Sequence, residues 1–375
     1  MILDILSLFV VFLLSIRLIV ALSNLCFSVF KTSRATSGDI PFVSVLIPAR
    51  NEAQRIPILL TSLLKDPSLN IEILVYDDMS DDGTAQVVNT FTVNDSRVRL
   101  LSGTTLPQGW LGKNYACSQL ASFAKGDYLL FLDADVRLDA SLIPQAISYA
   151  MKKKLVLLSF FPVQMMLTLP ELLTVPLMNR ILVSLLPLKL TSLSRRPSLS
   201  AANGQFMLFE ASTYHKYHFH DLVKNQKVED IKIFRVIKKI SKKIPQSERL
   251  RAETLLGNKM IKCRMYEGWE EAMNGFSKNV IEFFGGKPLV AISCALIFAF
   301  GFLLPLLAWG WIAGLLYLFA SLVLCVVVSL ASIQPVFKNL FLAPLQQLCL
   351  VYLVAFAWAK KNKRNNIWKG RNVDA

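Results

Sequence analysis

An uncharged run in the second half of the chain limits its fold most strongly. From Pro288 to Phe337 there is no Asp, Glu, Lys or Arg. About 20 apolar residues span a bilayer as a helix, so the run is long enough for two crossings, with a tight turn near Gly310. The chain is 54% hydrophobic and 18% charged, against about 45–50% and about 25% in soluble domains. An entirely soluble, disordered, collagen-like or disulfide-stapled protein is therefore excluded.

A second apolar segment begins the sequence. Residues 1–30 carry only Asp4 and Arg17 as charged side chains, and Lys31 and Arg34 follow. A signal peptide needs a basic start, a shorter apolar core and a small-residue cleavage site, none of which is clear here. We expect a retained transmembrane anchor. By the positive-inside tendency, its basic exit places the following domain, residues 31–287, in the cytoplasm.

A third apolar stretch, residues 339–359, is interrupted by Pro344 and by the pair Gln346–Gln347. The tail that follows, residues 360–375, is basic. Three crossings that start in the cytoplasm would place this tail outside, against the positive-inside tendency. We therefore expect transmembrane and interfacial helices over residues 288–359, with 339–359 as the re-entrant or interfacial stretch, and a cytoplasmic tail. The number of crossings stays open.

The net charge of +15 fits a face against anionic lipid headgroups or the cytoplasmic retention of loops. Binding of nucleic acid is disfavoured, because the basic clusters border apolar segments and do not interleave with aromatic residues. The six cysteines show no C-x-x-C spacing. This pattern favours a reducing compartment without disulfides or a zinc site.

Between the apolar segments, predicted strands alternate with predicted helices. The strands are residues 43–47, 71–76 and 128–132, and the helices are residues 56–64 and 84–90. Such alternation is typical of an α/β fold with a parallel, doubly wound sheet. Ligands of such sheets bind at the carboxyl ends of the strands.

Polar side chains follow each of these three strands. The segments are Pro48-Ala49-Arg50-Asn51-Glu52, Asp77-Asp78-Met79-Ser80-Asp81-Asp82-Gly83-Thr84 and Asp133-Ala134-Asp135. One acidic turn is explained by helix capping, which remains an alternative for Ser80 and Asp81. Three acidic strand ends need a cation or hydrogen-bond donors between them. Residues i and i+2 of an extended segment point the same way, so Asp133 and Asp135 can address one divalent ion, Mg²⁺ or Mn²⁺.

These motifs, together with Gly109-Trp110-Leu111-Gly112-Lys113, resemble those of inverting family-2 glycosyltransferases of the GT-A fold, a Rossmann-like nucleotide-sugar-binding domain. The resemblance extends to about residue 279. The flanking apolar segments and the closing Ile367-Trp368-Lys369-Gly370-Arg371 resemble a membrane-bound bacterial subgroup that acts on carotenoid (diaponeurosporenoate-type) or hopanoid lipids.

The resemblance implies roles for individual residues. Pro48, Arg50 and Glu52 match the loop that holds the nucleoside, and Asp77 and Asp78 match the pair that reads the uracil ring of a UDP-sugar. Asp133 then lies on the ribose side and Asp135 ligates the metal, whereas Lys113 lies near the diphosphate. Taken alone, a lysine after a glycine is usually a solvated loop residue.

Residues of the second half match the reaction centre of the family. Asn203-Gly204-Gln205 resembles its G-Q strand near the sugar, and Glu229-Asp230 its Glu-Asp pair, in which Asp230 is the general base. In an inverting displacement one carboxylate takes the acceptor proton while the metal stabilises the departing diphosphate. The alternative for Glu229 and Asp230 is the acidic first turn of a helix.

Two departures from the family pattern affect the prediction. The stretch Arg264-Met265-Tyr266-Glu267-Gly268-Trp269 stands where processive members carry Gln-x-x-Arg-Trp, which favours transfer of a single sugar. All three histidines lie in residues 214–220. They offer a weak metal pattern, and His220 is expected near the edge of the active site.

Two further segments indicate contact with lipid. Residues 155–190 are apolar and rich in proline, which favours short helices lying in the membrane interface. After Asp230, Ile233, Ile237, Ile240 and Ile244 share a helical face beside four lysines. A helix packed in the core is the alternative for each segment.

Together these features predict a multi-pass membrane enzyme that transfers one sugar from a nucleotide-sugar to a membrane lipid, such as a carotenoid or another terpenoid. Transfer to a polyprenyl phosphate or a glycolipid is an alternative. Another is a catalytically silent membrane scaffold, which the intact Asp133, Asp135 and Asp230 disfavour.

Overall fold

The computed structural model describes residues 1–31, 41–362, 367–368 and 371–372. These residues form two compact units. The sheet unit consists of Phe30–Val163 and Leu188–Cys263, and the helical unit of Met1–Val29, Gln164–Pro187 and Arg264–Ala375. Lys369 and Gly370 of the closing motif lie outside the described residues, as do Lys363 and Arg364 of the basic tail. Of that motif, only the short strands β11 (Ile367–Trp368) and β12 (Arg371–Asn372) are described.

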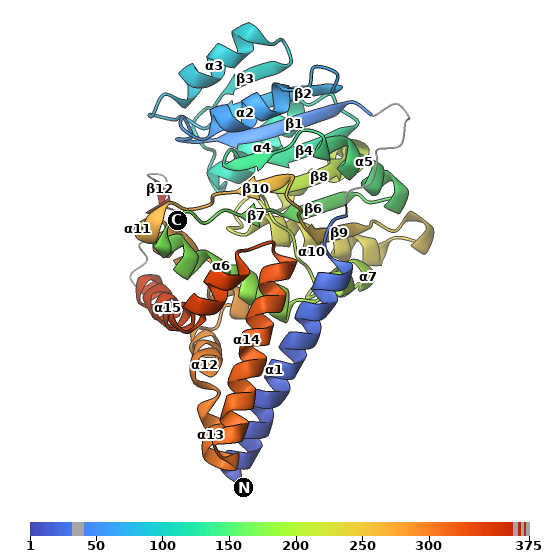
Figure 1. Ribbon diagram of the computed structural model, residues 1–375. Coiled ribbons are helices and arrows are strands. Elements are labelled where there is room, and N and C mark those ends of the chain that lie inside the picture. The colour runs from blue at the N-terminus through green and yellow to red at the C-terminus, as the bar shows by residue number, and fades with distance from the viewer. Residues whose placement is uncertain (32–40, 363–366, 369–370, 373–375) are drawn as a thin grey trace. The chain divides into compact units, whose positions relative to one another are not determined.

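The sheet unit is built on a mixed, seven-stranded sheet (Figure 1). Its strands follow one another in the order β3 (Val98–Ser102), β2 (Ile71–Asp77), β1 (Val43–Ala49), β4 (Tyr128–Leu132), β8 (Phe206–Glu210), β6 (Leu157–Phe161) and β9 (Ala252–Leu256). β1 pairs in parallel with β2 and with β4, whereas β8 is antiparallel to β4 and to β6. The predicted α/β fold is confirmed, and the three predicted strands pair in parallel, but the antiparallel β8 makes the sheet as a whole mixed.

The path of the chain sets the direction of β8, and this direction determines which segment lies beside Asp133. After β6 the chain returns to the sheet at the same edge at which β6 ends, so β8 runs in the opposite direction. In this register Phe206, the first residue of β8, pairs with Leu132, the last residue of β4. The segment before β8 therefore enters the sheet beside the carboxyl end of β4, where Asp133 follows.

Helices cover both faces of the sheet. The connecting helices are α2 (Ile56–Leu64), α3 (Thr84–Asn94), α4 (Gly112–Phe123) and α5 (Leu142–Lys153). Because successive side chains of a strand point to opposite faces, Val45 and Ile47 of β1 join one apolar cluster and Leu46 joins the other. The predicted helix 56–64 and strand 128–132 have these bounds in the structure.

The other elements of this part include a small sheet with the order β5 (Val136–Leu138), β10 (Ile261–Cys263) and β7 (Val163–Gln164). The short helices are α7 (Leu188–Leu193), α8 (Ala211–Tyr217), α9 (Phe219–Leu222) and η1 (Gln246–Glu248). The long helix α10 (Glu229–Lys243) places Ile233 and Ile237 in the second apolar cluster. The core-packed alternative for α10 is thus confirmed.

The predicted interfacial segment 155–190 is wrong in its first part. Leu157 and Leu158 are fully buried in β6, between β8 and β9. A strand covered on both faces is apolar throughout, which is why its sequence resembled a membrane segment. The remainder is mainly helix α6 (Leu169–Leu185).

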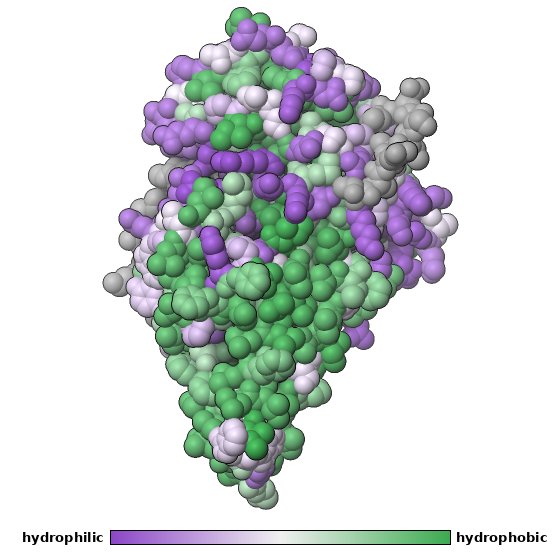
Figure 2. Space-filling view, viewed as in Figure 1, coloured by the Kyte–Doolittle hydropathy of each residue, from purple (hydrophilic) through white to green (hydrophobic). Residues whose placement is uncertain are grey.

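Among the described residues, three helices of the helical unit are long and apolar enough to cross a membrane. They are α1 (Ile2–Phe27), α14 (Trp311–Ala331) and α15 (Val336–Asn362). The shorter helices are α11 (Gly268–Ser277), η2 (Glu282–Phe284), α12 (Pro288–Phe300) and α13 (Leu303–Trp309). The segments Gly268–Phe284 and Pro288–Phe300 are together also long and apolar enough, but the chain bends by 98° between them. Figure 2 shows hydrophobic residues over the visible face of α1, α13 and α14.

Two predictions for the helical unit concern the turn near Gly310 and the stretch 339–359. The tight turn near Gly310 is confirmed, since Gly310 separates α13 from α14 with a φ of 91°. The stretch 339–359 belongs to one helix, α15, which continues through Pro344. Gln346 is fully buried, accepts a hydrogen bond from Arg180 Nη2 at 2.7 Å and donates to the carbonyl of Leu172 at 2.7 Å. Partners on α6 thus satisfy this polar group, and the interfacial placement of 339–359 stays a prediction.

Polar contacts inside the helical unit also hold α1 against α6. Arg17 Nε donates to Ser184 Oγ at 3.1 Å, and the guanidinium lies 3.6 Å from the centre of the Phe298 ring. Asn24 Nδ2 donates to the carbonyl of Val183 at 2.8 Å. Polar groups that face inward between helices leave an apolar exterior.

Candidate active site

Side chains that follow β1 are bound to the loop that follows β2. Arg50 Nη1 donates to the carbonyl of Asp78 at 2.5 Å, and the amide of Glu52 donates to Thr84 Oγ1 at 2.9 Å. Asn51 adopts a positive φ of 54° and receives a hydrogen bond on Oδ1 from the amide of Asp81 at 3.1 Å. These contacts fix the first two predicted strand ends against each other at one edge of the sheet. Ser80 Oγ accepts the amide of Asn51 at 3.0 Å, so Ser80 and Asp81 hold the loop together. They do not cap α3, because Asp82 Oδ1 accepts the amide of Thr84 at 3.0 Å, and the capping alternative for Ser80 and Asp81 is therefore wrong.

Asp77 and Asp78 lie at the end of β2 and are 9% and 6% exposed. The amide of Gly103 donates to the carbonyl of Asp77 at 2.7 Å, and a Cβ on Gly103 would lie 2.4 Å from that oxygen. Only glycine permits this approach. Pro48 lies one residue before the end of β1, opposite Tyr76 in the register.

Lys113 joins carboxylates from two distant parts of the sequence. Its Nζ lies 2.7 Å from Asp133 Oδ1, after β4, and 3.1 Å from Glu229 Oε1, at the start of α10. Burial alone would lower the pKa of Lys113, but the two carboxylates hold it well above its usual value. The solvated-loop alternative for Lys113 is therefore wrong.

Asp135 has an electrostatic environment that calls for a cation. Its Oδ1 is buried without a hydrogen-bond partner. Burial, and then the charges of Asp133 and Glu52, raise the pKa of Asp135 to about 7. Among the described residues, no three His, Cys, Asp or Glu side chains are placed to hold a metal ion. Mg²⁺ commonly uses one or two carboxylates and takes its other oxygen ligands from water and phosphate, and the orphaned oxygen of Asp135 beside Asp133 fits such a site.

The segment before β8 lies between these acidic groups. Gln205 Nε2 donates to Cys263 Sγ at 2.7 Å, and the Cys263 thiol in turn donates to Asp135. The amide of Gln205 donates to Asn203 Oδ1 at 2.8 Å, and Ser159 Oγ on β6 receives the amide of Asn203 at 2.8 Å. Gln205 is thereby linked to the second carboxylate of the D-x-D motif.

Asp230 lies in the first turn of α10, as its alternative interpretation proposed, and it is also part of the site. The amide of Gly204 donates to Asp230 Oδ2 at 3.0 Å, and the amide of Ile231 donates to Oδ1 at 2.7 Å. Burial, and then the charge of Glu229, raise the pKa of Asp230 to about 7. A carboxylate with such a pKa accepts a proton readily near neutral pH.

The position of Asp230 depends on α4. Asn114 is buried, and its Nδ2 donates to the carbonyl oxygens of Val223, Lys224 and Gln226 at 2.9, 3.1 and 3.1 Å. The carbonyl of Lys224 also accepts the amide of Leu111 at 2.8 Å. The helix that carries Lys113 therefore also holds the segment that leads into α10.

Sequence reasoning missed three contributors to this site. Glu229 appeared only as the neighbour of Asp230, Cys263 only as a scattered cysteine, and Gly204 only as part of a motif. A Cβ on Gly204 would lie 2.8 Å from Lys113 Nζ and 3.1 Å from Glu229 Oε1. No local signal predicts the roles of Cys263 and Glu229, because the contacts join residues distant in the sequence.

The expectation for His220 is wrong. This residue is 1% exposed, its Nδ1 lies 2.6 Å from the Tyr214 hydroxyl, and its ring packs against Phe131. Burial, and then the charge of Lys113, lower its pKa to about 3. His220 is thus a neutral core residue, and the metal pattern of the three histidines has no counterpart among the described residues.

Comparisons with known proteins show what this chain is similar to. Residues 44–217 match the family model Glycosyl transferase family 2. Over 241 residues the chain is 29% identical to a 4,4'-diaponeurosporenoate glycosyltransferase of Staphylococcus haemolyticus, covering 64% of this chain and 60% of that protein. It is 33% identical over 121 residues to an undecaprenyl-phosphate 4-deoxy-4-formamido-L-arabinose transferase of Aeromonas hydrophila, covering 30% and 35%.

A solved structure shares the fold over nearly the whole chain. It is a mannosyltransferase from Pyrobaculum calidifontis in complex with GDP-Man and Mn²⁺, with a TM-score of 0.55 and 14% identity, covering 96% of this chain and 99% of that one. The sheet unit therefore has the GT-A fold. Residues 44–217 form a domain that matches glycosyl transferase family 2. The aligned part spans about three fifths of the staphylococcal relative.

Proposed function

We propose that this enzyme transfers a single sugar from a nucleotide-sugar, a UDP-sugar by its motif pattern, to a lipid in the membrane, with inversion at the sugar carbon. The observation that carries the proposal is the partly buried Asp230, held by the amide of Gly204 beside the Lys113–Asp133 pair. A proton acceptor and a cationic group meet in one site, as a single displacement requires.

In the proposed reaction a hydroxyl oxygen of the acceptor attacks the anomeric carbon of the sugar. The bond from this carbon to the diphosphate breaks, the nucleoside diphosphate leaves with the electron pair, and the hydroxyl proton passes to Asp230 Oδ1 or Oδ2. If the acceptor presents a carboxylate, the same displacement occurs without proton transfer. The Lys113 ammonium, between Asp133 and Glu229, lies where it can offset negative charge on the leaving group.

A divalent metal ion fits this site. Asp135, supported by Asp133, would hold Mg²⁺ or Mn²⁺, which supplies positive charge for the diphosphate. The Mn²⁺ in the Pyrobaculum calidifontis complex supports this assignment by analogy of fold. Cys263 and Gln205 then keep the orientation of the Asp135 carboxylate through their hydrogen bonds.

For the nucleotide we propose that Pro48, Arg50, Glu52, Asp77 and Asp78 line the nucleoside site. The loop contacts between Arg50 and Asp78 support this grouping. Gln205 would lie near the sugar.

The helical unit supports a membrane acceptor. Asp4 Oδ1 accepts a hydrogen bond from Trp309 Nε1 at 3.1 Å, so the start of α1 and the turn before α14 lie together. Figure 1 shows α1 and α14 side by side, whereas α15 lies on the other side of α14, above α12, and runs in a different direction. We propose that α1, the α12–α13 pair and α14 cross the membrane and that α15 lies in the interface. The basic tail and the sheet unit are then both cytoplasmic, in agreement with the positive-inside tendency.

A carotenoid-type or other terpenoid lipid is the proposed acceptor, because the staphylococcal relative is described as a 4,4'-diaponeurosporenoate glycosyltransferase. A polyprenyl phosphate is the second candidate, supported by the name of the Aeromonas hydrophila relative. Lipids from cells with and without the gene, compared by mass spectrometry, distinguish the two. Loss of a glycosylated terpenoid supports the first, loss of a glycosylated polyprenyl phosphate supports the second, and an unchanged lipid profile contradicts both.

Capture of the lipid can be tested at the start of α6. Leu167 and Leu169 are 62% and 57% exposed, whereas Met166 packs against the core of the helical unit. Replacing both leucines with Ser should raise the KM for the lipid and leave nucleotide binding unchanged. Val93, 85% exposed on α3, offers a matched control as Val93→Ser. Equal use of a water-soluble acceptor by the wild-type enzyme would contradict the proposal.

A further inference from the structure

A basic pocket lies in the sheet unit. Of the elements that form it, only α10 also contributes to the active site. It is lined by Ser192, Ser194, Arg195, Lys238, Ser241, Arg249, Leu250, Arg251 and Ala252. These residues come from α7 and the loop after it, from the second half of α10 and from the segment that enters β9. No acidic residue lines the pocket. We call this the basic pocket.

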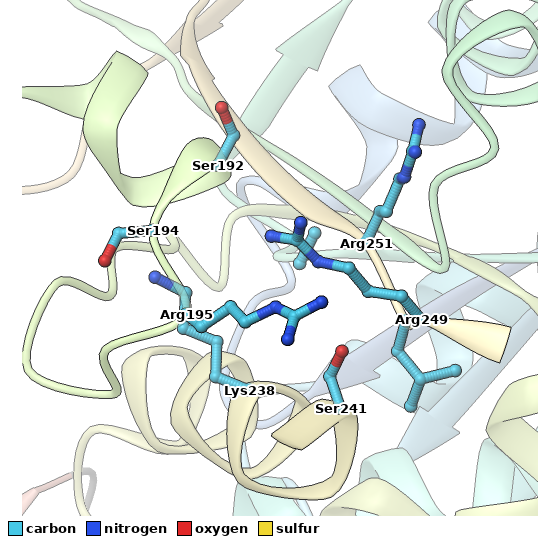
Figure 3. A pocket seen from close by; sticks show the side chains of 9 residues that line it. Ser192, Ser194, Arg195, Lys238, Ser241, Arg249 and Arg251 are labelled. Atoms are coloured by element: carbon cyan, nitrogen blue, oxygen red, sulfur yellow. The ribbon is translucent and has the colours of Figure 1, made fainter. Parts of the chain in front are cut away.

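Two guanidinium groups meet in this pocket. In Figure 3, Arg195 and Arg249 extend toward each other, while Arg251 points away. Arg195 Nη2 donates to Gln246 Oε1 at 3.1 Å, and Arg249 Nη2 donates to the carbonyl of Leu193 at 3.3 Å. Among the ion pairs of the described residues, none includes either arginine. Neutral acceptors therefore hold the two cations in place and do not neutralise them.

The charges of the basic pocket oppose one another. Burial, and then the charges of Arg195 and Arg251, lower the pKa of Arg249. Burial, and then the charge of Arg249, lower the pKa of Lys238 to about 8. Lys238 Nζ is turned to the carbonyl oxygens of Arg196 and Leu199. An arrangement of like charges is stabilised by a bound anion.

Ser241 supplies an independent observation. It is 6% exposed, and its hydroxyl is buried without a hydrogen-bond partner. Figure 3 shows this hydroxyl aimed at the space between Arg195 and Arg249. A buried hydroxyl without a partner costs free energy, which a ligand that accepts its hydrogen bond would recover.

We propose that the basic pocket binds a phosphate group, through Arg195, Arg249 and the hydroxyl of Ser241. The planar guanidinium matches two oxygens of a phosphate, and the serine hydroxyl donates to a third. The phosphate belongs either to the headgroup of an anionic phospholipid or to a free phosphate ion. Ser241 follows Asp230 by about three turns on α10, or about 16 Å along the helix, so this site is distinct from the nucleotide site.

Binding can be measured on the full-length protein in neutral detergent. The unfolding temperature is recorded against increasing inorganic phosphate, with chloride keeping the ionic strength constant, for wild type and for Arg195→Gln/Arg249→Gln. The control is Lys242→Gln/Lys243→Gln, which removes the same charge from two exposed residues of α10. We expect phosphate to stabilise wild type and control, and the arginine variant to need at least tenfold more phosphate.

A second arm identifies the source of the phosphate. The same proteins are placed in nanodiscs of phosphatidylcholine with or without phosphatidylglycerol, and retained lipid is counted by native mass spectrometry. Retention of phosphatidylglycerol by wild type and control alone assigns the headgroup, whereas a response to inorganic phosphate alone assigns the free ion. If wild type and the arginine variant respond alike in both arms, the proposal is wrong. Should the double variant not fold, Arg195→Gln, at an exposed residue, serves for the same comparison.

Discussion

The backbone amide of Gly204 and Oδ2 of Asp230 form a hydrogen bond of 3.0 Å, although 26 residues separate them in the sequence. The bond connects the segment before β8 with the first turn of α10. It places the proposed base beside the Lys113–Glu229 pair, because a Cβ on Gly204 would nearly touch both of those side chains.

With an acceptor that presents a hydroxyl, replacing Asp230 with Asn should lower turnover by about 10²–10⁴-fold, the usual contribution of a general base. The amide side chain keeps the shape but cannot take the acceptor proton. Nucleotide affinity, measured by calorimetry, should stay at the wild-type value. Asp221→Asn, at an exposed residue bonded to Ser118, should retain full activity. A loss of nucleotide binding in Asp230→Asn would place Asp230 in the nucleotide site instead.

The rate should rise with pH in the neutral range. Asp230 must be ionised to act as a base, and burial and Glu229 raise its pKa to about 7, so the enzyme is mostly inactive below that pH and active above it. The residual rate of Asp230→Asn should lack this dependence. Initial rates between about pH 5.5 and 8.5, at saturating donor and acceptor, test the prediction. A wild-type rate that is constant over this range would contradict it.

The raised pKa of Asp230 also makes the stability of the protein depend on pH. The rate is expected to rise with pH, whereas the stability should fall. Because the pKa is higher in the folded state than the usual value of 3.8, folding favours the protonated form. The contribution of Asp230 to stability is therefore present below the unfolded-state pKa and is lost as the pH rises toward 7. Asp230→Asn should remove this loss, which denaturant titrations at acidic and neutral pH can detect.

Gly204→Ala should disturb the reaction more than the fold. The added Cβ would lie 2.8 Å from Lys113 Nζ, and the flexible end of this lysine can move away at little cost. The displaced ammonium would then leave the diphosphate. We expect the donor KM to rise by roughly tenfold, equivalent to about 1.4 kcal/mol, with a nearly unchanged unfolding temperature. An unchanged KM would show that Lys113 does not contact the donor.

Lys113→Gln should weaken donor binding and also lower stability. Without the ammonium, the carboxylates of Asp133 and Glu229 lose their shared partner. Removing a hydrogen bond to a charged group costs about 1.5–3 kcal/mol, and the partial exposure of Lys113 places the loss of stability at the lower end. Lys125→Gln, at an exposed residue that follows α4, is the matched control. Equal behaviour of the two variants would exclude a role for Lys113.

Removal of the metal and Asp135→Asn should have the same consequence. Chelation should abolish nucleotide binding and turnover in the wild type, and added Mn²⁺ or Mg²⁺ should restore both. Asp135→Asn should bind nucleotide weakly whether or not Mn²⁺ is present, as monitored by calorimetry. Asp139→Asn is the control, because Asp139 lies four residues later and its Oδ1 accepts hydrogen bonds from the amide and the hydroxyl of Ser141. This variant should keep its Mn²⁺ response. Full activity of the chelated enzyme would remove the metal from the mechanism.

Local sequence determined much of this protein. The alternation of strands and helices, the acidic strand ends, and the apolar segments at 1–30 and 288–337 follow from periodicity and side-chain chemistry within short windows. Helix 56–64 and strand 128–132 could be bounded by residue, because their flanking residues end the apolar pattern. The D-x-D motif carried enough chemistry to predict a cation site, whereas the role of Asp230 was implied by the resemblance to the family.

Tertiary structure decided what depends on contacts between distant residues. β6 resembled a membrane segment because a strand buried on both faces is as apolar as one in lipid, and only its neighbours β8 and β9 distinguish the two. Likewise, α15 stays continuous because Arg180 and Leu172 on α6 satisfy Gln346. Cys263 became a neighbour of Asp135 only through the pairing of β10 with β5. Burial and partners are properties of the folded chain, and they fixed the ionisation of Asp230 that its sequence position alone did not reveal.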